Sequence, residues 1–223
     1  MGIDIHPAVN SGPPLIPREL SAGLGSPGSG LAKPERSETG VWIGIFAIVM
    51  SFAAFTSAMI VRQGVTPDWR HFALPPILYV NTLTLLVSSI TLAWANRQLA
   101  SVGPQLLGAR DRARQSYSDG MNWLYGTLAL GVLFVVGQVL AWRSLVSQGL
   151  FLSTNPSSSF FYVFTGMHGL HVLGGIAGLV YMICKLARTN GTARTTGLRA
   201  MSVYWHFMDG LWIYLLVLLM VRT

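Results

Sequence analysis

Charged residues are scarce in this sequence. Of its 223 residues, 10% are Asp, Glu, Lys or Arg, whereas a soluble domain carries about 25%. Cys184 is the single cysteine, so the chain forms no intrachain disulfide and no cysteine-cluster metal site. In place of charge, 52% of the residues are hydrophobic, and apolar runs of 20 or more residues recur five times. The composition excludes a soluble domain and predicts an integral membrane protein.

Acidic residues are the scarcer of the two signs. There are 8 of them against 15 Lys and Arg, which gives a formal net charge of +7. In a soluble protein this excess could indicate nucleic-acid binding. Here the basic residues lie between hydrophobic runs, where they orient the chain and meet anionic lipid. We therefore expect membrane lipids, and no nucleic acid, as partners.

The order of the apolar runs predicts an all-α, polytopic membrane protein with five transmembrane helices in a bundle. This domain is expected over residues 40–223, with spans at about 40–61, 74–95, 120–142, 160–184 and 200–221. Residues 1–39 are rich in Pro, Gly and Ser and hold no long apolar run, so we expect a disordered tail. The tail also lacks the basic start and apolar centre of a cleavable signal peptide.

The orientation in the membrane follows from the distribution of Lys and Arg. The tail and the loops after the second and fourth spans hold 11 of them, against 4 in the other loops and the C-terminus. The positive-inside rule then predicts a cytoplasmic N-terminus and an external C-terminus. An odd number of spans agrees with this topology.

The fourth span holds the most unusual polar residues. It runs for 25 residues from Phe160 without a formal charge, yet it contains His168 and His171, which lie on one helix face because they are three apart. Ionisable groups at that depth face protein or water rather than lipid. Gly174 and Gly178 form a GxxxG pair, a weak signal by itself, that permits close helix packing. We expect this helix to lie inside the bundle.

Six polar residues are expected within the membrane, and three interpretations compete for them. The six are Asn81, Gln138, His168, His171, His206 and Asp209. The first interpretation is a metal or haem site, because His168 or His171 could face His206 from another helix. The second is a path for protons or a substrate. The third, which the residues alone favour, is a network of interhelix hydrogen bonds, each worth about 0.6 kcal/mol on average.

Several segments resemble one known family. The stretch FYVFTGMHGLHVLGG closely resembles the signature helix of subunit III of the haem-copper oxidases, and YWHFMDGLW resembles the last helix of that family. VNTLTLLVSSITLAWA, TLALGVLFVVGQVLAW and GVWIGIFAIVMSF resemble three further helices. The resemblance covers all five spans in family order, from about residue 40 to the end. It matches the five-helix form of a family whose longer members have seven helices.

The resemblance implies a non-catalytic subunit III of a terminal haem-copper respiratory oxidase, with cytochrome c oxidase as the first choice. Such a complex reduces oxygen and pumps protons, and this chain would support its assembly, lipid binding and stable turnover. Haem and copper would lie in partner subunits and none in this chain, which would bind phospholipid. The implied partners are catalytic subunit I, with subunits II and IV, in a bacterial inner membrane.

Other functions remain open from the sequence alone. Within the family these are a quinol oxidase or a nitric oxide reductase accessory subunit. In a different class they are an independent membrane transporter or a b-type cytochrome.

The chain also departs from the family pattern. Two membrane glutamates of the family fall at Ile48 and Ala141, and a third acid is replaced near Arg199. We therefore do not assign to this chain any role that those carboxylates have in the family.

The basic residues at the span ends suggest where lipid could bind. Arg97 follows the second span and Arg199 precedes the fifth, so both are expected near the membrane surface. Guanidinium groups at that level attract lipid phosphates. From charge and position we expect Arg97 and Arg199 to contribute to lipid binding.

Overall fold

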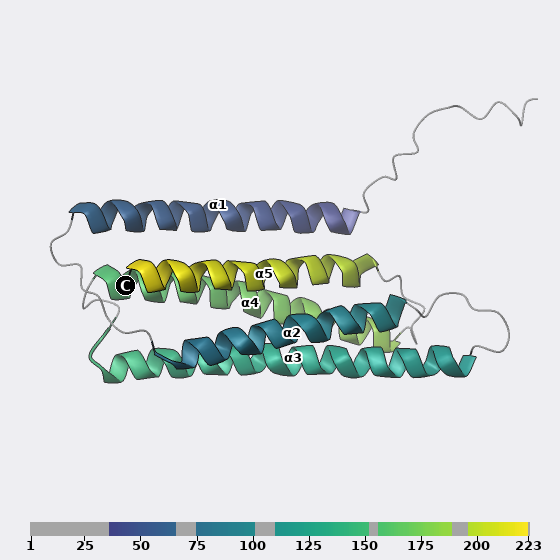
Figure 1. Ribbon diagram of the computed structural model, residues 1–223. Coiled ribbons are helices and arrows are strands. Elements are labelled where there is room, and N and C mark those ends of the chain that lie inside the picture. Colours follow the sequence, from purple (N-terminus) through teal and green to yellow (C-terminus); the bar gives the residue numbers. More distant parts are fainter. Residues whose placement is uncertain (1–35, 66–74, 101–109, 152–155, 189–195, 223) are drawn as a thin grey trace, which may run out of the picture. The chain divides into compact units, whose positions relative to one another are not determined.

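The computed structural model describes residues 36–65, 75–100, 110–151, 156–188 and 196–222 (Figure 1). Every regular element in this part of the chain is a helix, which confirms the all-α class. The helices are α1 (Arg36–Val65), α2 (Ile77–Ala100), α3 (Arg110–Ser147), α4 (Pro156–Arg188) and α5 (Thr196–Arg222). Residues 1–35 lie outside the described residues, so the disordered tail stays a prediction. Residues 36–39, which we assigned to the tail, form the first turn of α1.

All five helices are long and apolar enough to cross a membrane. Their outer faces are apolar as well: Phe46 is 66% exposed and Leu170 is 63% exposed. Soluble proteins rarely expose large continuous apolar surfaces, whereas lipid is the solvent that suits them. The five-span prediction is confirmed, and the exposed apolar side chains are those expected to face lipid.

The ends of the helices follow from local backbone chemistry. Pro75 and Pro76 precede α2, and their carbonyls accept hydrogen bonds of 3.1 Å from the backbone amides of Leu78 and Tyr79, respectively. The C-terminal end of α3 is followed by Gly149, whose φ is 75°. The amide of Gly149 bonds the carbonyl of Val146, and the amide of Leu150 bonds that of Leu145. This is a Schellman turn, in which glycine tolerates the left-handed conformation.

The helices alternate in direction along the chain (Figure 1). Helix α2 packs most extensively against α3, and α2, α3, α4 and α5 surround a common interior. Helix α1 contacts α5 and, to a smaller extent, α4. Two hydrogen bonds join it to α5: the hydroxyls of Thr56 and Tyr214 lie 2.9 Å apart, and Arg222 donates to Gln63 over 3.0 Å.

Two apolar clusters fill the interior at different depths. One contains aromatic side chains from four helices, including Phe52, Phe134, Phe164 and Trp212. The other lies at the end where α2 finishes and α5 starts, and Trp205 contributes to it from α5. The polar candidates of the sequence therefore have to be accommodated among closely packed rings and aliphatic side chains.

Candidate functional site

The most regular polar contact in the bundle joins α2 to α5. The indole Nε1 of Trp212 donates to the Thr82 hydroxyl over 2.9 Å, and the indole Nε1 of Trp205 donates to Ser88 over 3.0 Å. Trp205 and Trp212 share one face of α5 because they are seven residues apart. As the α2 residue number rises, the α5 partner number falls, as antiparallel packing requires. The two bonds therefore fix the register of α2 against α5.

The same polar face of α2 makes two further bonds to neighbouring helices. Ser89 Oγ lies 2.6 Å from Nδ1 of His206 on α5, and the hydroxyls of Thr91 and Thr127 lie 2.8 Å apart between α2 and α3. Thr84, by contrast, bonds the carbonyl of Val80 in its own helix. From the second span, the sequence analysis named only Asn81 as a polar candidate within the membrane. The bonds show which other polar residues of α2 reach another helix.

Aromatic side chains of α3 and α5 also donate hydrogen bonds to α4. Trp142 on α3 donates its Nε1 to Thr165 over 3.0 Å. Tyr204 on α5 donates its hydroxyl to the backbone carbonyl of His171 over 2.9 Å. The candidates chosen from the sequence were amides, histidines and an aspartate, so the donor role of these aromatic residues was missed. The available signal was that a buried indole N–H or phenol O–H usually has a partner.

The three histidines occupy three different environments. His168 is fully buried, and its ring lies 5.0 Å from that of Trp212 and 5.8 Å from that of Phe134. Neither ring nitrogen of His168 has a hydrogen-bond partner within the described part of the chain. His171 is half-buried, and its Nδ1 lies 2.7 Å from the carbonyl of Met167 in its own helix. His206 is exposed and pairs with α2. The histidines are thus separate elements of the packing.

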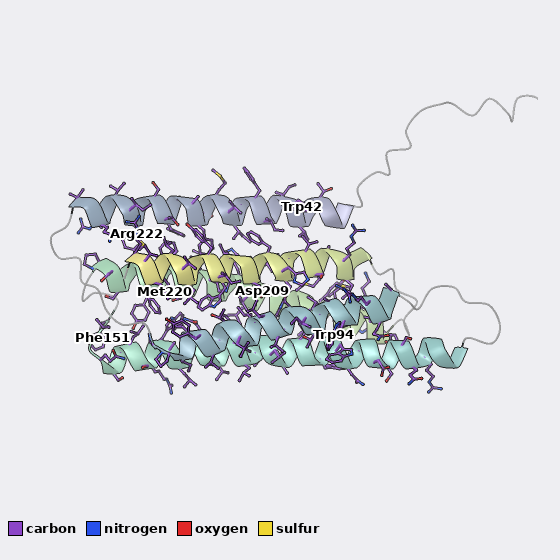
Figure 2. All side chains as sticks on the ribbon, in the orientation of Figure 1. Trp42, Trp94, Phe151, Asp209, Met220 and Arg222 are labelled. Atoms are coloured by element: carbon purple, nitrogen blue, oxygen red, sulfur yellow. The ribbon has the colours of Figure 1, made fainter. Side chains whose placement is uncertain are left out.

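The remaining three polar candidates are all buried. Asp209, midway along α5 (Figure 2), is 5% exposed, and Gln138 and Asn81 are each 3% exposed. Neither carboxylate oxygen of Asp209 has a hydrogen-bond partner among the described residues. The Gln138 amide and the Asn81 Nδ2 have no partner among the described residues. The structure places these groups in the interior, and the expected hydrogen-bond network between them stays a prediction.

Small residues set the closest helix approaches. A methyl group at Gly175 would lie 3.1 Å from the ring of Tyr204, and one at Gly178 would lie 3.2 Å from the sulfur of Met201. Gly174 is more open, because its nearest neighbour would be the Tyr204 hydroxyl at 3.9 Å. On α3, a Cβ at Gly137 would overlap the side-chain oxygen of Asn81. Gly137 therefore makes room for a buried amide.

The positions of the two absent glutamates belong to the apolar core. Ile48 is 7% exposed and Ala141 is fully buried, and both are part of the same apolar cluster. A carboxylate at either position would meet aliphatic and aromatic neighbours. Within the described residues, no three His, Cys, Asp or Glu side chains come together as a set of metal ligands.

Arg97 and Arg199 do come together. Both line one groove between the end of α2 and the start of α5, with a volume of about 360 Å³. The sequence placed each of them near the membrane surface. The structure adds that two helices far apart in the chain place both residues in the lining of the same groove.

The five helices are apolar on their outer surfaces, and indoles and hydroxyls form hydrogen bonds between them inside. These features define a polytopic α-helical membrane protein. The description of the matching family is cytochrome c oxidase subunit III, and the match extends over residues 37–222. The chain belongs to the cytochrome c oxidase subunit III family.

Relatives in several bacteria carry the family name. A probable cytochrome c oxidase subunit 3 of Nocardia farcinica is 28% identical, over 87% of this chain and 95% of the relative. The cytochrome c oxidase subunit 3 of Corynebacterium diphtheriae is 29% identical, over 84% of this chain and 88% of the relative. That of Thermostichus vulcanus is 29% identical over 85% and 89%.

The family resemblance found in the sequence is thereby confirmed. Membership makes the chain a non-catalytic subunit of an oxidoreductase complex, and respiration and proton translocation are functions of that complex. The independent transporter and the b-type cytochrome are not favoured by these matches. The polar interior is then best understood as part of a subunit that packs within a larger membrane assembly.

Proposed function

We propose that this chain is the subunit III of a bacterial cytochrome c oxidase and that it packs against the catalytic subunit I, in a complex that also holds subunits II and IV. The observation that carries this proposal is the family match over residues 37–222, which includes nearly all of α1 to α5. Cytochrome c, rather than quinol, is the proposed electron donor because the relatives are named for it.

The proposed contribution of the chain is assembly and stable turnover, together with the binding of phospholipid. Its interior supports this role through the way polar groups are used. Indole and hydroxyl groups bond across helix contacts, as in the pairs Trp212–Thr82 and Trp205–Ser88. We propose that the six polar residues named from the sequence help fix helix register in the same manner. Gly174 and Gly178 would assist by permitting close packing.

We also propose that the N-terminus is cytoplasmic and the C-terminus external, in a bacterial inner membrane. Support comes from the basic residues that the structure describes. At the end of the bundle where α2 finishes and α5 starts lie Arg97, Arg114, Lys185, Arg188 and Arg199. The opposite end holds Arg62, Arg143 and Arg222. The more basic end is the one that the positive-inside rule assigns to the cytoplasm.

Purification through a tag on this chain in a mild detergent tests the proposal. We expect haem absorbance to travel with the tagged chain, together with a large partner subunit identified by mass spectrometry. Stripping this chain away from its partners should leave it colourless. A co-purifying subunit with a copper-A motif would support cytochrome c as donor, and a subunit without that motif would favour quinol. A colourless chain that purifies without partners would refute the oxidase assignment.

A further inference from the structure

His206 is an exposed ionisable side chain within the membrane-spanning part of α5. It lies about 10 Å along the helix axis after Arg199 and about 24 Å before Arg222, at 1.5 Å per residue. The hydrocarbon core of a bilayer is about 30 Å thick, so His206 lies inside it when the two arginines lie at its surfaces. Ionisable groups at that depth face protein or water rather than lipid. The exposed ring of His206 therefore needs a polar partner beyond the described residues.

The hydrogen bond with Ser89 determines which atom of His206 is available to such a partner. Ser89 Oγ, on α2, lies 2.6 Å from Nδ1 of the imidazole ring. The other ring nitrogen, Nε2, makes no hydrogen bond within the described part of the chain. A neutral imidazole bonded at Nδ1 offers Nε2 as a donor or an acceptor, depending on the tautomer. His206 thus offers one directional polar atom on an exposed ring.

The surface around His206 is a trough with α5 as its floor and α1 and α2 as its walls. Helix α5 packs against both of the other helices, whereas α1 and α2 do not contact each other within the described residues. In Figure 1, α5 lies between them. A groove of about 360 Å³ between α2 and α5 reaches His206, and one of about 420 Å³ between α1 and α5 includes Gly210. His206 and Gly210 are four residues apart, so they share one face of α5. We call this surface the α5 trough.

The α5 trough combines open space, apolar walls and one polar atom. A Cβ at Gly210 would meet nothing within 4 Å, and glycine permits the close approach of another membrane helix. Val49 and Ala53 of α1 line the trough together with Phe207 of α5. Acyl chains would cover these apolar walls but supply no hydrogen-bond partner for His206, and the hydrocarbon region holds no water to replace it. A transmembrane helix supplies both an apolar surface and a polar side chain.

We propose that the α5 trough is the docking surface for one transmembrane helix of a partner subunit. This helix packs over Gly210 and carries a hydroxyl or amide side chain that bonds Nε2 of His206. The imidazole then makes two hydrogen bonds, one to Ser89 within the chain and one across the subunit contact. The proposal rests on the proposed assembly of this chain with other oxidase subunits, and it adds the face of the chain that takes part.

Photocrosslinking in the purified complex tests whether a helix lies in the trough. A photoreactive benzoylphenylalanine replaces Val49, which lines the trough and is 44% exposed, or Leu133, which is 55% exposed on α3 and lies outside it. At position 49 we expect an adduct with a polypeptide, and mass spectrometry should map it to a transmembrane segment of a partner. At position 133 we expect fewer such adducts. Lipid adducts alone at position 49, adducts with a second copy of this chain there, or equal polypeptide yields at both positions would overturn the proposal.

Substitutions separate the bond to the partner from the bond within the chain. His206→Leu removes both bonds, and Ser89→Ala removes only the one within the chain. Titration of the complex with a harsher detergent measures how much of the crosslinked partner is retained. His206→Leu should weaken retention about threefold, with about twentyfold as the upper limit, while Ser89→Ala should match the wild type within about twofold. His206→Gln keeps a donor and an acceptor and should restore retention. Unchanged retention in His206→Leu, or equal losses in His206→Leu and Ser89→Ala, would refute the docking bond.

Gly210→Leu tests the trough without altering His206. The chain has open space at this position, and Gly126→Leu on α3 is the matched control because a Cβ at Gly126 also meets nothing within 4 Å. Filling the trough should weaken retention of the partner about tenfold and abolish the adduct at position 49, and Gly126→Leu should change neither. Full retention of the partner by Gly210→Leu would contradict the proposal.

Haem absorbance in the same samples reports separately on the oxidase assignment. Haem that co-purifies with the wild type while position 49 yields no polypeptide adduct would refute the docking surface and leave the oxidase assignment intact. A transmembrane adduct at position 49 that Gly210→Leu abolishes, in a sample without haem, would refute the oxidase assignment and support the docking surface.

Discussion

The bond from Trp212 to Thr82 offers a direct test of how α5 is held against α2. Trp212 is 1% exposed, donates its indole N–H over 2.9 Å, and packs edge-on against Phe134 at 5.0 Å. Trp212→Phe removes the donor and part of the ring. Thr82→Val removes the acceptor at nearly constant volume but leaves a buried indole N–H without a partner. Each single change should therefore destabilise the bundle by about 1–3 kcal/mol.

A double-mutant cycle separates the hydrogen bond from the packing. The coupling energy between W212F and T82V should be about 0.6 kcal/mol, with roughly 1.7 kcal/mol as the upper bound, since these are the values found for bonds between membrane helices. The free energy of unfolding is measured by titration with a denaturing detergent in mixed micelles. Thr84 supplies the control because it bonds within α2, so a W212F/T84V cycle should show no coupling. Coupling no larger for Thr82 than for Thr84 would refute the reasoning.

Two further predictions concern helix contacts. Gly137→Ala would push a methyl group into the side chain of Asn81, so we expect about 1–3 kcal/mol of destabilisation in the same titration. Gly126→Ala, with no neighbour within 4 Å, should change stability by less than about 0.5 kcal/mol, and an equal effect of both would contradict this. Tyr204→Phe removes a bond to a backbone carbonyl of α4 and should cost about 0.6 kcal/mol while the haem spectrum of the complex is unchanged. Tyr181→Phe, at an exposed position on the outer surface, is the control and should leave stability unchanged. Loss of haem absorbance in an assembled Tyr204→Phe complex would contradict the prediction.

The fold could be predicted from the sequence because a bilayer imposes strong rules. Each span needs a long apolar run, and five such runs gave five helices. The first and last residues of each helix were harder to predict from the sequence. Helix α3 begins at Arg110, ten residues before the expected span, because hydropathy marks the membrane-buried part and is blind to a polar extension of the same helix. Its end at Ser147 depends on a glycine turn that hydropathy does not register either.

The interior was only partly predictable. The sequence correctly indicated that the helix with His168 lies inside the bundle, and His168 is buried. It could not show that His168 packs against rings while His206 bonds Ser89, because the environment of each side chain depends on other helices. The convergence of Arg97 and Arg199 was equally hidden, since about a hundred residues separate them in the chain and only antiparallel packing of α2 and α5 joins them.

The absent glutamates and the bonded tryptophans have a common physical explanation. A carboxylate within the membrane is costly unless it is paired. Ile48 on α1 and Ala141 on α3 lie in one continuous apolar cluster, which Trp212 also joins. With apolar residues at both positions, that cluster needs no buried ion partner, and dispersion and close packing can hold it together. Neutral groups can then contribute to the specificity of helix register. The indole–hydroxyl bonds of Trp212 and Trp205 provide it at two points along the same helix pair, without placing a charge in the bilayer.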